Sequence, residues 1–482
     1  MNALKKGFFF TSCFLWSRII IMSTQFLSLF IGNRQFYKKV LALMIPIMIQ
    51  NGITNFVNML DNIMIGRVGT VEMTGVAISN QLIFIFNLCI FGAISGAGIL
   101  GAQFVGKKDH DGLRYTFRYK ILLSIFLTVV CIVILYFAGE SLAGLYLNGE
   151  GNPADAAASL MFSRQYMLIM FIGLLPYAFS QCYASTLRET GETKIPMLCG
   201  MASVLVNLVL NYILIFGKFG APALGVQGAA IATVISRFVE LMFIVIWTHK
   251  HSERNQFIIG VYKTIYIPKK LVLQISSKGF PLLLNETLWA LGIAAINQSY
   301  STLGYDVVSS MNICQTFYNV FAVAFMSVGS AVGIILGQLL GANKFKEAKD
   351  SCRKLIAFSI FISVIVGVVY FICAGIIPQI YNTSEDIMNM ATIIMRICAI
   401  TMPLEAMAHA CYFTLRSGGK IFVTMLFDSV FVCLIMFPVA FGLSNLMLPI
   451  YLVYGVCQSL NLIKCIAGGV LVEKEIWIKK IV

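Results

Sequence analysis

The stretch Gly279-Phe280-Pro281-Leu282-Leu283-Leu284-Asn285-Glu286-Thr287 opens an apolar run that continues to Gly304 and carries one acid, Glu286, well inside it. Lipid disfavours a carboxylate at such a depth unless the group faces protein or water, so we interpret Glu286 as a functional candidate. A similar phrase, Ile45-Pro46-Ile47-Met48-Ile49-Gln50-Asn51-Gly52, lies 235 residues earlier. The chain therefore contains an internal duplication.

The duplication keeps its register well beyond this first phrase. The pairs at the same separation of 235 residues are Gly69 with Gly304, Asn80 with Gln315, Gly106 with Gly341, Arg118 with Arg353, Ser124 with Ser359 and Phe126 with Phe361. A second anchor, at a slightly shorter separation, matches Ala184-Ser185-Thr186-Leu187-Arg188 to Tyr412-Phe413-Thr414-Leu415-Arg416. A chance match would lose register within a few residues, so the sequence predicts two halves of one architecture.

The composition indicates a polytopic membrane protein. Of 482 residues, 59% are hydrophobic and only 12% are charged, with a mean hydropathy of +0.86, values that do not fit an ordinary soluble globule. The 13 cysteines are scattered singly, which favours neither a disulfide framework nor a zinc site. The chain has no phosphate-binding loop and no nucleophile or metal motif, so we expect no enzyme activity and no cofactor. Energy must then come from an ion gradient or from a partner.

Twelve apolar runs have the length that a bilayer requires. In the first half they cover residues 40–64, 75–104, 121–139, 158–186, 195–217 and 226–248, and in the second half residues 279–303, 308–340, 355–378, 389–414, 421–443 and 446–470. Six spans per half is an even number, so both halves enter the membrane from the same side and the repeats are parallel. The predicted fold is an all-α membrane protein with twelve transmembrane helices in two six-helix lobes.

The charges in the loops predict the orientation. The loops expected inside are rich in base, and they carry Lys107, Lys108, Arg114, Arg118 and Lys120, then Lys250, Arg254, Lys263, Lys269 and Lys270, then Lys344, Lys346, Lys349, Arg353 and Lys354. The alternate loops, 140–157 and 379–388, contain acids without any Lys or Arg. This alternation places both termini in the cytoplasm and explains the net charge of +14 as topological, which argues against nucleic acid as a partner.

The chain divides into five predicted parts. They are a cytoplasmic N-terminal segment at 1–39, an N-lobe at 40–248, a cytoplasmic linker at 249–278, a C-lobe at 279–470 and a cytoplasmic tail at 471–482. Within the first part, the apolar run from Gly7 to Trp16 is too short to span a bilayer. It is either an interfacial segment or the product of a start codon assigned too far upstream, Met22 then being the true start.

Five acids fall within predicted spans. Glu240 follows Arg237 by three residues, so a local ion pair explains it most simply, and Asp428 lies near the inner end of its helix, where partial hydration and a functional role are both open. Asp61, Glu286 and Glu405 have no basic neighbour on their own helices. A desolvated carboxylate requires a cation or a proton, so these three are predicted to couple ions, the alternative being a structural role in helix packing.

One histidine and four prolines complete the candidate set. His409 lies four residues after Glu405, and we expect the two to share a site and to titrate as a pair. Pro46, Pro176, Pro281 and Pro403 fall inside predicted helices at repeat-related places. Each removes a backbone hydrogen bond and allows a bend, which suits alternating access, although static kinks are equally compatible with the sequence.

Three further motifs carry a family resemblance. They are Asp61-Asn-Ile-Met-Ile-Gly66, Asn207-Leu-Val-Leu-Asn211-Tyr-Ile-Leu-Ile-Phe-Gly217 and Gly225-Val-Gln-Gly228-Ala-Ala-Ile-Ala-Thr233-Val-Ile-Ser-Arg237. Together with Pro46 and the two Leu-Arg anchors, they make residues 36–470 resemble the multidrug and toxic compound extrusion (MATE) family, and most closely its NorM-type branch. The resemblance implies two six-helix bundles around a central cavity that export organic cations in exchange for inward Na⁺ or H⁺, as a monomer in the inner (plasma) membrane.

The resemblance also implies roles for single residues. Asp61 resembles the first-helix acid of the N-lobe, and Asn207, Asn211 and Thr233 match its polar companions, although the proton-coupled branch has an aspartate at the position of Asn211. Glu286 matches an acid of the NorM-type branch, and Glu405 sits where that branch has an aspartate. An oxygen-rich site at Glu286 and Glu405 fits Na⁺ or H⁺ and lacks the ligand number for Ca²⁺.

Two other transport functions compete with this interpretation. A flippase for lipid-linked sugars shares the helix count, but it is expected to line its cavity with several Arg or Lys, and here only Arg164, Arg237, Arg396 and Lys464 come near a span. An ion channel would require a pore-lining ring or a selectivity filter, and the sequence contains neither.

Overall fold

The computed structural model describes residues 29–146, 153–381 and 383–482. Within these residues, twelve helical segments are long and apolar enough to cross a membrane, which confirms the predicted number of spans. The first six are α2 (Arg34–Gly66), α3 (Thr70–Lys107), α4 (His110–Tyr146), α5 (Pro153–Thr190), α6 (Lys194–Phe216) and α7 (Gly225–Lys250). The predicted interfacial segment and the choice between Met1 and Met22 lie outside the described residues.

The second half repeats this order with two irregular spans at its end. Its first four spans are α8 (Lys269–Ser301), α9 (Tyr305–Gly341), α10 (Phe345–Cys373) and α11 (Glu385–Ser417). The fifth combines α12 (Ile421–Met425), the π-helical η3 (Leu426–Val430) and η4 (Val432–Met436), and α13 (Phe437–Asn445), and the sixth combines α14 (Ile450–Ser459) and α15 (Asn461–Glu473). Single π-helical turns often mark functional sites, and this one contains Asp428.

Most of the helices are longer than the apolar runs that predicted them. The first begins at Arg34 rather than at residue 40, because Asn33 caps it: its side-chain oxygen accepts a hydrogen bond from the Phe36 amide at 2.8 Å. The seventh begins at Lys269, so the last part of the predicted linker 249–278 is helical. Polar residues extend a membrane helix beyond the hydrocarbon region, where hydropathy gives no signal.

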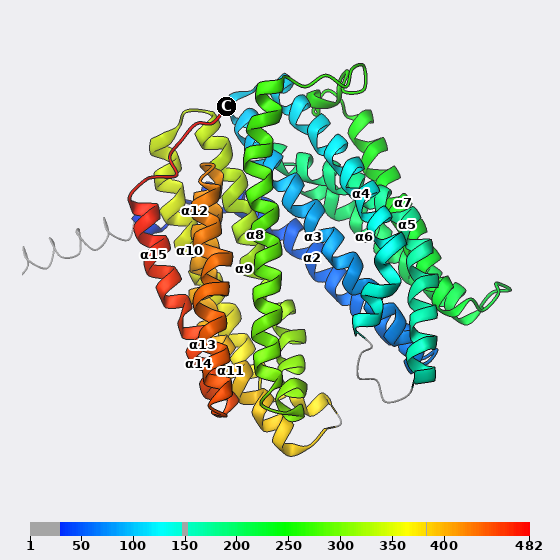
Figure 1. Cartoon of the computed structure of the whole chain (residues 1–482). Helices are drawn as coiled ribbons and strands as arrows, with labels where there is room; N and C mark the ends of the chain where they lie inside the picture. The colour runs from blue at the N-terminus through cyan, green and yellow to red at the C-terminus, as the bar shows by residue number, and fades with distance from the viewer. Residues whose placement is uncertain (1–28, 147–152, 382) are drawn as a thin grey trace, which may run out of the picture.

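The helices form two bundles that lie close together at one end of the molecule and diverge toward the other, with the C-terminus at the joined end (Figure 1). The first helix of each half packs against both bundles. Val40, Leu43, Met44 and Ile47 of α2 join a core built mainly from α9, α10 and α11, whereas Ile65 near the end of α2 joins the core of the first half. The start of α2 therefore packs into the core of the second half.

The first helix of the second half makes the reciprocal exchange. Leu271, Ile275 and Leu282 of α8 join the core of the first half, while Ile296 and Tyr300 pack within the second half. In both helices the residues up to and just past a proline, Pro46 in α2 and Pro281 in α8, pack with the opposite half, and the residues near the helix end pack with their own half. The predicted Pro176 and Pro403 likewise lie inside helices, α5 and α11.

The joined end is closed by a contact that repeats across the two halves. A Cβ atom at Gly106 would overlap the backbone oxygen of Gln338, and a Cβ atom at Gly341 would overlap the backbone oxygen of Gln103. The Gln338 Nε2 atom donates to the backbone oxygen of Glu189 at 2.7 Å, and the Gln103 Nε2 atom donates to that of Ser417 at 3.0 Å. Only glycine allows α3 and α9 to approach this closely.

Candidate functional site

In the first half, the four predicted polar residues lie together between α2, α6 and α7. The Asn211 Nδ2 atom donates to the Asp61 carboxylate at 2.7 Å and to the Asn207 Oδ1 atom at 3.2 Å. The Asn207 Nδ2 atom in turn lies 3.2 Å from the Thr233 hydroxyl. Asn207 and Asn211 are buried, while Asp61 is half-buried. The structure thus brings a single carboxylate and three neutral hydrogen-bonding groups into one cluster.

The groups around the Asn207 amide favour the opposite placement of its oxygen and nitrogen. With its oxygen and nitrogen exchanged, it would accept from Thr233 and donate to the Asp61 carboxylate, each at 3.2 Å. Asp61 would then receive two amide donors instead of one. Both asparagine side chains of α6 then donate hydrogen bonds to the Asp61 carboxylate of α2.

The predicted acids of the second half line a shared cavity of about 400 Å³, which we call the second-half cavity. Glu286 comes from α8, and Glu405 and His409 come from α11. Asp428 and Lys464 also line it, and Phe91 of α3 contributes one wall from the first half. Carboxylates from three spans therefore face one space that a small cation could enter.

Glu405 and His409 have different partners within this cavity. The Tyr318 hydroxyl donates to the Glu405 carboxylate, whereas the His409 ring is surrounded by Phe325, Phe413 and Tyr412 at centroid distances of 6.2, 4.9 and 6.4 Å. In the described part of the chain, no hydrogen bond or ion pair joins the two. The direct contact that their spacing predicted is absent, because the His409 ring turns toward α9.

Sequence reasoning named Asp428 and Lys464 separately but missed the polar contacts that join them in this cavity. The Lys464 ammonium lies 3.0 Å from the Asp428 carboxylate, and the Asn285 Nδ2 atom donates to Asp428 at 3.2 Å and to the Tyr412 hydroxyl at 3.3 Å. An Arg416 nitrogen donates to the same hydroxyl at 3.4 Å. Lys464 lies within the span Ile450–Glu473, and a cation at that depth was the signal that it pairs with an acid of another span.

The ion pair expected between Glu240 and Arg237 is not formed. The Arg237 guanidinium donates to the backbone oxygen of Gly173 at 3.3 Å and lies over the Tyr177 ring at 5.0 Å. Glu240 has no ion-pair partner within 4.0 Å among the residues that the structure describes, although Arg188 and Arg237 both interact with it electrostatically. A spacing of three residues brings side chains near each other without fixing where they point.

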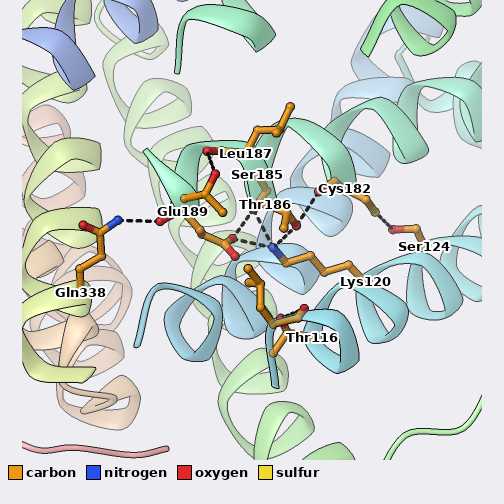
Figure 2. Close-up of polar contacts among 11 residues, drawn as sticks. Thr116, Lys120, Ser124, Cys182, Ser185, Thr186, Leu187, Glu189 and Gln338 are labelled. Carbon is orange, nitrogen blue, oxygen red and sulfur yellow. Dashed lines mark hydrogen bonds and ion pairs between the residues drawn. The ribbon is translucent and has the colours of Figure 1, made fainter. Parts of the chain in front are cut away.

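Lys120, which the sequence analysis assigned to a basic loop, is buried. Figure 2 shows the Lys120 ammonium pointing at Glu189, 2.5 Å from its carboxylate, with the Thr186 and Ser185 hydroxyls at 2.9 and 3.2 Å. The side chains of Lys120 and Glu189 are 0% and 6% exposed. Lys120 therefore holds α4 against the end of α5 and contributes nothing to the loop charge, because a buried cation requires a buried anion.

A second, smaller cavity lies where the two halves meet. It has a volume of about 140 Å³, and Glu189 and Arg188 line it from the first half, with Arg416 and Ser417 from the second. The two arginines of the Leu-Arg anchors thus face one space. Two similar halves with charged groups inside their spans, and a cavity between them, define a helical membrane transporter.

Comparison with known proteins agrees with this class. The MatE family model matches residues 46–213 and, separately, residues 281–441, so each half carries one match and both matches begin at the repeat-related prolines. The chain belongs to the MatE family. It is a multi-pass membrane transporter and not an enzyme.

Individual relatives are distant but cover most of the chain. The "Probable multidrug resistance protein NorM" of Thermotoga maritima is 24% identical over 84% of this chain and 85% of its own length. "Multidrug resistance protein MdtK" of Yersinia pseudotuberculosis is 25% identical over 75% of this chain and 78% of its own length. A solved structure described as the outward-facing conformation of a multidrug resistance MATE family transporter has a TM-score of 0.81 at 18% identity, covering 92% of this chain and 97% of that one.

Proposed function

We propose that this protein exports organic cations in exchange for inward Na⁺ or H⁺. The observation that carries the proposal is the charge balance of the second-half cavity. Asp428 is paired with Lys464, whereas Glu286 and Glu405 have no cation within ion-pairing distance among the described residues. Arg416 interacts electrostatically with Glu286 from farther away. Two carboxylates are therefore free to hold a coupling ion and to release it to a cationic solute. The names of the relatives support a multidrug substrate range.

The exchange follows from competition for these carboxylates. A buried carboxylate must carry a proton or a metal cation, or face another positive charge. If a solute cation and a coupling ion use the same carboxylates, the binding of one promotes release of the other. The Tyr318 hydroxyl donates its hydrogen to Glu405, and its oxygen lone pair would be a neutral ligand for whichever cation is present. Carboxylate and hydroxyl oxygens suit Na⁺, and the same carboxylates can accept a proton.

The cluster around Asp61 would provide a third carboxylate for coupling. It lies in the other half and contains no cationic side chain among its four residues. Asp61 would be the group that titrates or binds Na⁺, with Asn207, Asn211 and Thr233 adjusting their hydrogen bonds around it. Bends at Pro46, Pro176, Pro281 and Pro403 would accompany the change between the two open states.

Energetics favour an exchanger over a uniporter. Expelling a monovalent cation against an inside-negative potential costs about 2.3 kcal/mol per 100 mV. Inward movement of one Na⁺ or H⁺ cancels that term and adds the free energy of its own gradient. In this scheme both termini and the linker are cytoplasmic, and the protein resides in the inner (plasma) membrane and acts as a monomer. One lobe runs from α2 to α7 and the other from α8 to α15.

Flux measurements in proteoliposomes test the proposal. An organic cation gradient should drive counterflow of Na⁺ or H⁺ in the parent protein. Glu286→Gln should abolish this flux while insertion is unchanged, because the amide copies the shape of the side chain without its charge. Glu385→Gln, at an exposed acid in the first turn of α11, is the matched control and should retain the flux. Normal coupled transport by Glu286→Gln would refute the proposed role.

One observation favours a second candidate function. Lys464 and Arg416 both line the second-half cavity, and a flippase for lipid-linked sugars would use such cations to bind a pyrophosphate. The ion pair with Asp428 neutralises Lys464, so the cation exchanger explains the cavity better. Transfer of a fluorescent pyrophosphate-linked lipid between leaflets, without coupled ion flux, would favour the flippase.

A further inference from the structure

A groove of about 740 Å³ lies outside both cavities, between the start of α2 and the start of α6. Three cationic side chains line it: Arg34 and Lys38 from α2, and Lys194 from α6. Its remaining wall is apolar and includes Leu41, Ile45 and Pro46, further along α2. Positive charge at one end and an apolar wall leading away from it form the pattern that an amphiphile recognises.

The pattern follows from the different surroundings of two faces of α2. Val40, Leu43, Met44 and Ile47 are buried in the core that α2 shares with the second half. The opposite face of the same turns is left outside, and Ile45 there is 39% exposed. In a membrane-spanning helix, such a face is in contact with lipid.

Among the residues that the structure describes, the three cations have no ion-pair partner. Arg34, Lys38 and Lys194 are all exposed. Arg34 and Lys194 begin two candidate spans, Arg34–Val57 and Lys194–Phe216. The ends of spans lie at the level of the lipid headgroups, where anionic phosphates attract Lys and Arg.

We propose that this groove binds an anionic phospholipid. Its phosphate would lie among Arg34, Lys38 and Lys194, and one acyl chain would follow Leu41, Ile45 and Pro46. Residues 1–28 cannot supply the negative charge that would neutralise these three cations, because they contain Lys5, Lys6 and Arg18 and no acid.

The lipid would connect the two halves across the joined end. The start of α2 packs on the second half, whereas Lys194 begins a helix whose residues Cys199 and Ile215 lie in the core of the first half. The Thr193 hydroxyl donates to the backbone oxygen of Ala42 at 3.0 Å, which holds the two walls of the groove together in this conformation. Separating the halves at this end would move Lys194 away from Arg34 and Lys38, so the bound lipid stabilises the closed state of this end.

Native mass spectrometry of the full chain in mild detergent tests the proposal. The probe is an equimolar mixture of phosphatidylglycerol and phosphatidylcholine with identical acyl chains. The parent protein should retain one phosphatidylglycerol in preference to phosphatidylcholine. The triple variant Arg34→Gln, Lys38→Gln, Lys194→Gln should bind it about a hundredfold more weakly, because each cation near an anionic lipid contributes about 1 kcal/mol. The single variant Lys194→Glu should show a loss in the same direction.

The control is a triple variant with the same change in charge elsewhere. Lys39, Lys250 and Lys346 are exposed and do not line the groove, so Lys39→Gln, Lys250→Gln, Lys346→Gln should keep the bound phosphatidylglycerol. Undiminished retention by the groove variants would overturn the proposal. Equal loss in the control, or equal binding of phosphatidylcholine by the parent, would overturn it as well.

Discussion

Asp428 and Lys464 are two charges that depend on each other. Their side chains are 21% and 10% exposed, and their charged atoms are 3.0 Å apart. The interior of a span gives little solvation to either group alone. Asn285 donates a further hydrogen bond to Asp428, so the pair fixes α8 and the π-helical turn of the fifth span in relation to α15.

Asp428→Asn should therefore destabilise the protein. It leaves the Lys464 ammonium without its anion, while the new amide oxygen can still accept from Asn285. We expect a loss of about 2 to 3 kcal/mol, below the 3 to 5 kcal/mol of a fully buried pair because both groups retain some exposure. Thermal unfolding in detergent measures it. The double variant Asp428→Asn, Lys464→Met should recover most of the loss, and no recovery would show that the pair is not the cause.

Asp61→Asn addresses function rather than stability. Asn211 and Thr233 can hydrogen-bond an amide at this position, so we expect normal membrane expression and thermal stability with transport reduced at least about tenfold. Expression by immunoblot and coupled flux in proteoliposomes separate the two effects. A variant that fails to fold would show that Asp61 is structural.

The sequence predicted some residues of the site but not their partners. Acids in apolar runs are visible in one sequence, and family resemblance added Asn207, Asn211 and Thr233 beside Asp61. The partners of those acids were not visible, since Tyr318 and Glu405 lie 87 residues apart in the chain. The side-chain direction of His409 also depends on packing against α9, which spacing within one helix does not determine.

At the scale of elements, α3 and α9 control the closed end. Gly106 and Gly341 let each helix reach the backbone oxygen of a glutamine on the other. Hydropathy predicted both helices, because long apolar runs have few alternatives in a bilayer. It did not predict that the first helix of each half packs on the opposite half, because burial against lipid and burial against protein demand the same apolar residues.

Gly106→Ala should shift the protein away from the observed conformation. The added methyl overlaps the Gln338 backbone, and overpacking of about 1 to 3 kcal/mol corresponds to a population change of about tenfold. Spin labels at the repeat-related residues Thr70 and Tyr305, which begin α3 and α9, should report a shorter distance. Gly52→Ala, where a Cβ meets nothing within 4 Å, is the control. An unchanged distance distribution in Gly106→Ala would contradict this role.

At the scale of the whole molecule, orientation in the membrane remains a prediction from loop charge. The burial of Lys120 removes one positive charge from the predicted loop at the start of α4, but Lys107 and Lys108 are exposed at the same end. The joined end therefore keeps its basic character and should face the cytoplasm.

Cysteine labelling decides the orientation. In a background without native cysteines, a cysteine at Asp155 should react with a membrane-impermeant maleimide in intact cells. A cysteine at Lys263, which is exposed in the connection between α7 and α8, should react only after permeabilisation. Labelling of Lys263 from outside would invert the topology.

The crossed first helices have a consequence for biosynthesis. The core of the first half includes Leu271, Ile275 and Leu282, so it is incomplete when the ribosome has made only the first six spans. The apolar face of α2 that carries Val40 and Met44 likewise stays uncovered by protein until α9 and α11 have been inserted. Neither half is a finished folding unit by itself, and a chain truncated after α7 would lack the side chains that cover α3.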